Sequence, residues 1–136
     1  MHPRGRALLW IDCVAGFTGG TLVVSFKEWL SDLHAFPEDL VLFLGLSNLA
    51  YASYSLTLAT RASMGRTPSR RSIELLVIAN AAWVLVCASV IASTWPFATV
   101  FGLAHVGLEG LFVGSLAFTQ YRVILEGWGR APGATT

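Results

Sequence analysis

The chain has 136 residues, of which 54% are hydrophobic and 12% are charged, and its mean hydropathy is +0.63. This length predicts a single domain over residues 1–136, and this composition excludes an ordinary soluble domain. The net charge of +1 gives no argument for a nucleic-acid partner. Cys13 and Cys87 lie in apolar runs without ligand spacing around them, so we expect no disulfide, no metal site and no cofactor.

Four apolar runs are long enough to cross the hydrocarbon layer of a bilayer as helices, because one crossing needs about 20 apolar residues. We therefore predict an all-α fold, an integral membrane bundle of four transmembrane helices. Short loops should make successive helices antiparallel neighbours. The expected spans cover about residues 7–26, 40–59, 72–93 and 97–121.

Basic residues are distributed unequally between the two sides of this topology. Eight of the nine lie in the N-terminal segment, in the loop between the second and third spans, and in the C-terminal segment; Lys27 is the exception. Segments rich in Lys and Arg stay on the cytoplasmic side. Both termini are therefore predicted to be cytoplasmic, and we expect a bacterial inner (plasma) membrane as the location.

The first loop, residues 27–39, combines apolar residues at helical spacing with several acidic residues. Trp29, Leu30 and Leu33 would share one face of a short amphipathic helix lying along the membrane surface. The acidic residues have two interpretations, a solvated rim or a vestibule that attracts cations.

An ionisable pair, His105 and Glu109, lies in the middle of the fourth run. Residues four apart share one face of a helix, and a rise of about 1.5 Å per residue puts them roughly 13 and 18 Å below the outer edge. Ionisable groups at such depths are costly, and they most often serve a function. The alternative is a structural role, in which the two side chains bond to each other or to neighbouring backbone.

The other three spans each contribute a polar group at a similar level. Asp12 could instead snorkel towards the cytoplasmic headgroups, and a lone asparagine more often joins helices than binds a ligand. Desolvation raises the pKa of a carboxyl group and a nearby imidazolium lowers it, so we expect the cluster to titrate near neutral pH. The sequence predicts a site between the four helices that binds a substrate, ion or proton through His105, Glu109, Asp12, Asn48, Asn80, Tyr51 and Trp83.

Two strips of glycine lie on the first and fourth spans. Glycine lets helix backbones approach closely in lipid, and two such strips offer more close-packing surface than one small bundle needs. We therefore expect a homo-oligomer, a dimer or larger. Its contacts would use the strip Gly16, Gly19 and Gly20 or the strip Gly107, Gly110 and Gly114.

A weak internal similarity relates the second and fourth spans. Gly45-Leu-Ser-Asn48-Leu-Ala aligns without gaps with Gly102-Leu-Ala-His105-Val-Gly. Such an alignment would relate two helical hairpins by an axis along the membrane normal, as in transporters with parallel repeats. The pattern predicts a tandem repeat of two hairpins.

The motif His105-x-x-x-Glu109-Gly110-x-Phe112-Val113 resembles a short motif of the membrane-embedded sterol isomerase family, and it covers nine of the 136 residues. In that family the histidine and the glutamate line the sterol site. The resemblance implies acid–base or lipid-binding roles for His105 and Glu109.

These features favour a small transporter or channel-like protein for an ion or a small polar or amphiphilic solute, with proton linkage through His105 and Glu109. One alternative is a membrane-embedded enzyme or lipid-binding module with isomerase-like chemistry on a hydrophobic substrate. Another is an accessory subunit whose polar residues dock a partner. A water path from both sides would indicate transport, whereas a lateral pocket lined by aromatic residues would indicate an enzyme.

Overall fold

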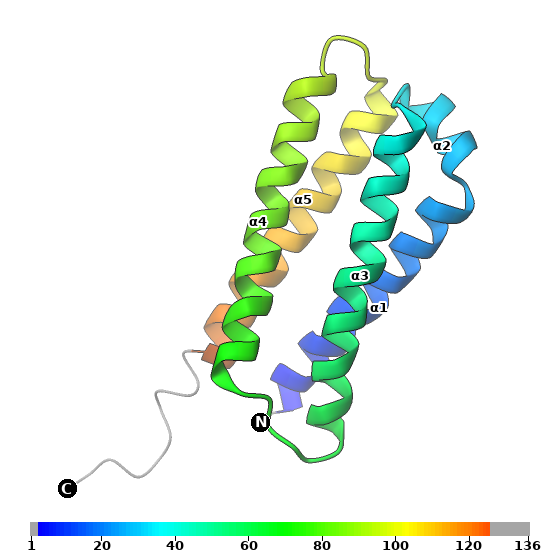
Figure 1. Ribbon diagram of the computed structural model, residues 1–136. Coiled ribbons are helices and arrows are strands. Elements are labelled where there is room, and N and C mark those ends of the chain that lie inside the picture. The colour runs from blue at the N-terminus through cyan, green and yellow to red at the C-terminus, as the bar shows by residue number, and fades with distance from the viewer. Residues whose placement is uncertain (1–2, 126–136) are drawn as a thin grey trace, which may run out of the picture.

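The computed structural model describes residues 3–125, which form a bundle of helices (Figure 1). No strand occurs in this part of the chain. The long apolar helices are of sufficient length to cross a membrane, so the predicted fold of four spans is confirmed. The elements are α1 (Pro3–Ser25), α2 (Lys27–His34), α3 (Glu38–Ser63), α4 (Arg70–Thr94), α5 (Val100–Gln120) and the π-helical turn η1 (Tyr121–Leu125), and the four spans are α1, α3, α4 and α5 with η1.

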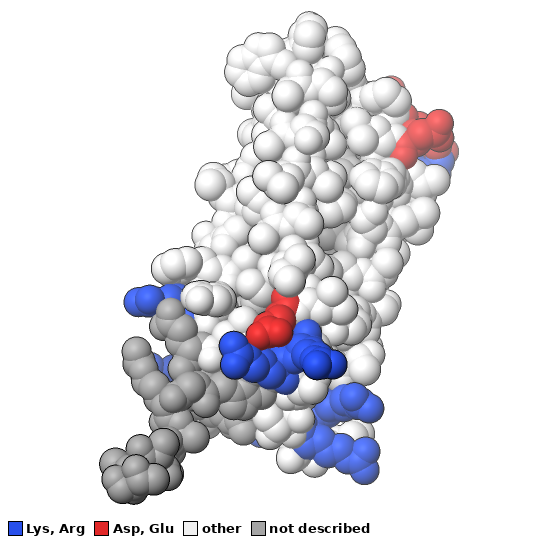
Figure 2. Space-filling model, turned by 60° about the vertical axis from the view of Figure 1, so that its left-hand side comes forward, with Lys and Arg blue, Asp and Glu red and all other residues white. Residues whose placement is uncertain are grey.

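The outer surface of the bundle is apolar between two polar ends. Large side chains such as Leu85 and Leu111 are exposed there, which suits a lipid environment and would be costly in water. Figure 2 shows most basic residues gathered at the end where α1 begins, with one acidic group among them, and a second acidic group with a basic neighbour at the other end. The cytoplasmic location of the basic end stays a prediction from the positive-inside rule.

The long helices pair as two antiparallel hairpins (Figure 1). The first hairpin is α1 with α3, joined through α2, and the second is α4 with α5 and η1. The backbones of the two hairpins approach each other at few places. Asn48 and His105, which the internal alignment equates, lie in different hairpins. The axis that would relate the two hairpins, and the duplication itself, stay predictions.

Glycines set the close packing inside each hairpin. A Cβ added at Gly20 would lie 2.9 Å from the Gly45 carbonyl oxygen, and one at Gly16 would lie 2.9 Å from Ala52 Cβ. In the second hairpin, a Cβ at Gly110 would lie 3.1 Å from Cys87 Cβ. A side chain at Gly16 or Gly20 would therefore force α1 and α3 to shift, whereas one at Gly110 would require Cys87 to give by a few tenths of an ångström.

This packing changes the argument for self-association. Gly16 and Gly20 face α3 of the same chain, and Gly110 and Gly114 face α4. Most of the glycines that suggested an oligomer contact are therefore already used within the bundle. The homo-oligomer stays a prediction, without support from these strips.

The short helix α2 folds back onto the start of α5. Thr99 donates its backbone N–H to the His34 carbonyl at 3.0 Å, and its hydroxyl donates to the Leu33 carbonyl at 2.7 Å. Gly102 allows this contact, because a Cβ there would lie 2.9 Å from the His34 carbonyl oxygen. The amphipathic helix predicted in the first loop is present, with Trp29 exposed, and it links the first hairpin to the second.

Two apolar clusters fill the ends of the bundle and leave its middle for polar groups. We call them the basic-end cluster, near the arginines, and the acidic-end cluster. The basic-end cluster contains Leu9, Leu58, Ala59, Ala62, Ile73, Leu76, Ile124 and Leu125. The acidic-end cluster contains Val23, Phe36, Val41, Leu44, Cys87, Val90 and Val106.

Candidate functional site

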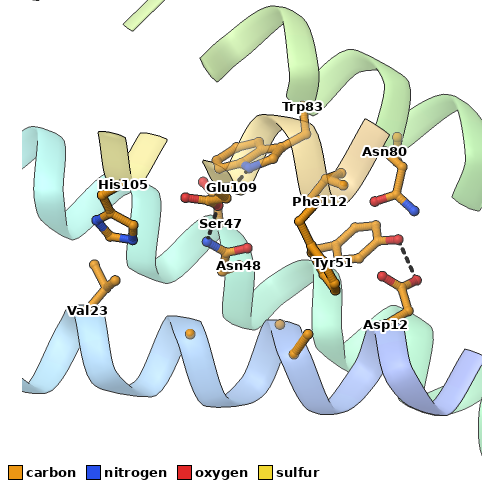
Figure 3. Close-up of a pocket in the computed structure, with 15 residues that line it drawn as sticks. Asp12, Val23, Ser47, Asn48, Tyr51, Asn80, Trp83, His105, Glu109 and Phe112 are labelled. Carbon is orange, nitrogen blue, oxygen red and sulfur yellow. Dashed lines mark hydrogen bonds between the residues drawn. The ribbon is translucent and has the colours of Figure 1, made fainter. Parts of the chain in front are cut away.

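A cavity of about 280 Å³ lies between the two hairpins, and all four long helices line it (Figure 3). The lining includes each of the seven residues that the sequence predicts for the site. Whether these residues bind a ligand stays a prediction. The cavity is lined by Asp12, Ala15, Gly16, Gly19, Val23, Ser47, Asn48, Tyr51, Ala79, Asn80, Trp83, His105, Glu109, Phe112 and Val113.

Glu109 is held by donors from two other helices. Its Oε1 accepts a hydrogen bond from Asn48 Nδ2 at 2.7 Å and another from Trp83 Nε1 at 2.8 Å (Figure 3). Asn48 belongs to the first hairpin, whereas Trp83 and Glu109 belong to the second. The carboxylate is therefore fixed at the interface between the hairpins, facing the cavity.

Asp12 forms a second centre, deeper towards the basic end. Its Oδ2 accepts hydrogen bonds from Tyr51 at 2.6 Å, Ser55 at 3.1 Å and Gln120 at 3.1 Å. The side chain of Asn80 donates to Gln120 Oε1 at 3.1 Å, so the network connects all four long helices. Asp12 is only 3% exposed and points into the bundle, which does not fit the snorkelling interpretation.

The Asp12 network includes two residues that the sequence analysis did not propose, Ser55 and Gln120. Both are fully buried. A signal was available for each: Ser55 is one turn beyond Tyr51, and Gln120 is three turns beyond Glu109 on the same face. Gln120 lies at the end of the expected span, where a polar residue is not unusual and does not indicate a site.

His105 is not paired with Glu109. No hydrogen bond joins the two side chains within residues 3–125, although both line the cavity. The His105 ring instead lies 5.0 Å from the ring of His34, with an angle of 50° between the planes. The alternative in which His105 and Glu109 bond to each other is therefore not what the structure shows.

His34 was not singled out in the sequence, because its contact with His105 depends on the way α2 folds back. It is buried and also lies 5.4 Å from the ring of Phe36. Burial lowers the pKa of His34 below its ordinary value of 6.5, and the neighbouring His105 lowers it further. His34 therefore favours the neutral form at neutral pH.

The rest of the cavity wall is aromatic or small. Trp83 packs against Phe43 with ring centroids 6.2 Å apart. Phe112 is 46% exposed while it also lines the cavity, so this part of the wall reaches the lipid-facing surface. A Cβ added at Gly19 would meet no atom within 4 Å, so the glycine leaves open space at the wall.

The donors to the two cavity carboxylates are all uncharged side chains. Ion pairs in the described residues join Lys27 to Glu38 and Arg70 to Glu74, near the two ends of the bundle. The same residues contain no group of three His, Cys, Asp or Glu side chains arranged to hold a metal ion. The cavity thus combines two carboxyl groups with apolar walls.

Comparison with protein-family models, with curated proteins and with solved structures finds no match for this chain. The similarity to sterol isomerases therefore remains a local resemblance around His105 and Glu109. The chain is an integral membrane protein by its four spans, and any finer function rests on the cavity.

Proposed function

We propose that this protein is a small carrier that takes a small amphiphilic solute into the cavity between its two hairpins. Glu109 and His105 would hold the polar part of the solute and provide proton linkage. The observation that carries the proposal is the position of the cavity, midway along the bundle and between two paired halves. Transporters built from two halves bind substrate at such an interface and rock one half against the other.

Two hydrogen bonds at the cavity join the halves and would respond to a solute. Asn48 reaches Glu109 across the interface, and Gln120 reaches Asp12. A proton or a solute donor that engages Glu109 competes with Asn48 for the carboxylate. Loss of that bond would weaken one connection between the hairpins and so couple binding to their relative movement.

The two ends of the bundle favour a carrier over an open channel. The basic-end and acidic-end clusters contain residues from both hairpins and lie on either side of the polar centres. A channel needs a continuous water path, whereas a carrier is occluded in part of its cycle. Apolar clusters at both ends of the described bundle support a carrier, because a carrier does not need a water path that is open at both ends at once.

A second candidate, a membrane-embedded enzyme or lipid-binding module, is favoured by the composition of the wall. Tyr51, Trp83 and Phe112 line the cavity, and Phe112 reaches the outer surface. Ligand pockets are typically about 300–1,000 Å³, so a cavity of about 280 Å³ suits only a small substrate or part of a larger one. An accessory subunit has less support, because the polar residues find their partners within this chain.

Reconstitution tests the carrier directly. Protein in liposomes that contain a pH-sensitive dye is exposed to a short alkylamine, an amino alcohol or a monocarboxylic acid, and internal pH is followed. We expect solute-dependent proton flux in the wild type and at least about tenfold slower flux in Glu109→Gln and in His105→Ala. The control Glu74→Gln alters a carboxyl group outside the cavity and should leave the flux unchanged.

Other outcomes separate the alternatives. Absent flux together with a co-purifying lipid that is lost in Glu109→Gln and His105→Ala would support the lipid-binding module. Flux that persists unchanged in both variants would show that the two side chains have a structural role.

A further inference from the structure

We infer that the cavity selects a small organic cation with an apolar group, such as an aromatic or alkyl ammonium ion. The inference rests on the proposed uptake of a solute into the cavity and adds the chemical class of that solute. It follows from three features of the wall: its charges, its aromatic rings and its scarcity of metal-ligating groups.

The first feature is a pair of carboxyl groups that have no basic side chain among their hydrogen-bond donors. Glu109 and Asp12 both line the cavity, and every donor described for them is an uncharged side chain. A carboxylate in a low-dielectric layer is costly without an opposite charge. A cationic ligand supplies that charge, whereas an anionic ligand would be repelled by an ionised carboxyl group.

Glu109 is the carboxylate that a ligand can reach. Asp12 is almost fully buried and occupied by three donors on one oxygen. Glu109 is partly exposed, and both of its donors bind Oε1. Within residues 3–125 no hydrogen bond to its other oxygen, Oε2, is seen, so that oxygen can meet an ammonium group.

The second feature is the set of aromatic residues around this position. Trp83, Tyr51 and Phe112 come from three helices and line the same cavity as Glu109 (Figure 3). Aromatic faces attract ammonium groups, and the attraction is stronger when water is excluded. A carboxylate combined with several aromatic rings binds alkylated ammonium ions better than strongly hydrated ones.

The third feature separates an organic cation from an inorganic one. The described residues offer no group of three His, Cys, Asp or Glu side chains arranged to hold a metal ion, and apolar residues such as Val23 and Val113 form part of the wall. A metal ion would fill little of a cavity of about 280 Å³ and would lack oxygen ligands on these sides. An ammonium ion with an apolar substituent uses both kinds of wall.

The test compares benzyltrimethylammonium with neopentylbenzene, its uncharged carbon isostere. Binding to the full chain in phosphatidylcholine nanodiscs is measured by titration calorimetry, with empty nanodiscs as background. We expect saturable binding of the cation and at least tenfold weaker binding of the isostere. Affinity for the cation should fall at least tenfold in Glu109→Gln and be unchanged in Glu74→Gln. Glu109→Asp retains the carboxyl group and should keep the preference for the cation over the isostere, which tests the inference even if Glu109→Gln does not fold.

Gly19→Phe distinguishes failure of this inference from failure of the proposed function, because it fills the open space at the cavity wall. If the isostere binds as tightly as the cation and both are lost in Gly19→Phe, the cavity takes up solutes but the choice of a cation is wrong. If both probes bind equally in the wild type and in Gly19→Phe, binding occurs elsewhere and both proposals are overturned. Absence of saturable binding of the cation to the wild type overturns the inference.

Discussion

Asn48 donates a hydrogen bond of 2.7 Å to Glu109 across the interface between the two hairpins. Trp83 donates to the same carboxylate oxygen from within the second hairpin. A single oxygen atom thus receives one donor from each half of the protein. Any event that changes the charge or the occupancy of Glu109 therefore acts on a contact between the halves as well as on the cavity.

The two donors to Glu109 should be energetically coupled. Hydrogen bonds between transmembrane helices contribute about 0.6 kcal/mol on average and up to about 1.7 kcal/mol. We expect Asn48→Ala and Trp83→Phe each to lower the free energy of unfolding in detergent by about 1 kcal/mol, with a non-additive double variant. Ser53→Ala, which removes a bond to the carbonyl of its own helix, is the control and should change little. Additive effects of Asn48→Ala and Trp83→Phe would contradict a shared carboxylate.

Adjacent glycines should differ sharply in their tolerance to substitution. A Cβ at Gly20 would lie 2.8 Å from Leu49 Cγ, whereas a Cβ at Gly19 meets nothing within 4 Å. Overpacking costs about 1–3 kcal/mol, so Gly20→Ala should lower thermal stability. Gly19→Ala should be neutral or stabilising, because alanine favours a helix by about 1 kcal/mol over glycine. Thermal unfolding followed by circular dichroism compares the two variants, and equal effects would contradict the packing of α1 on α3.

Protonation should loosen the contact between α2 and α5. The pKa of His34 in the folded protein lies below its ordinary value of 6.5 because of burial and the neighbouring His105. The unfolded state therefore binds the proton more readily, and stability is retained above about pH 6.5 and declines as the pH falls below it. Hydrogen exchange of α2 amides at pH 7.5 and pH 5.5 measures this, with each rate divided by the intrinsic exchange rate at that pH. We expect this relative rate to be higher at pH 5.5 in the wild type, and to change less in His34→Phe, which keeps an aromatic ring. A wild-type rate that falls on acidification, after correction for intrinsic exchange, would contradict the sign.

The topology can be tested by cysteine labelling. In a background without Cys13 and Cys87, Arg66→Cys and Asp32→Cys introduce thiols at opposite ends of the bundle, both at exposed positions. A membrane-impermeant reagent applied to intact cells should label Asp32→Cys and leave Arg66→Cys unlabelled until the membrane is opened. The reverse pattern would refute the cytoplasmic location of the basic end.

The sequence predicted the fold and the inward-facing position of several polar residues, because both depend on helical periodicity. Four long apolar runs are sufficient to count the spans, and polar residues at similar depths on inward faces are brought near one another when the helices pack. Asp12, Asn48 and Glu109 were placed together by this reasoning alone.

The pairing of individual groups could not be predicted, because it depends on the rotation of each helix about its axis and on the path of the loops. His105 meets His34 only because α2 folds back onto α5. Gly110 could equally have faced a second copy of the chain or the neighbouring helix α4, and spacing does not distinguish these partners.

The unequal packing of the bundle has a consequence for its assembly during synthesis. Most contacts between helix backbones lie within each hairpin, and the close approach of Gly102 to His34 joins the two hairpins at the acidic end. The first hairpin can therefore close while the second is still being made, and the loop around Gly65 has only to tether two finished halves. Two separate polypeptides, broken in that loop, should find each other in the membrane and rebuild the cavity between them.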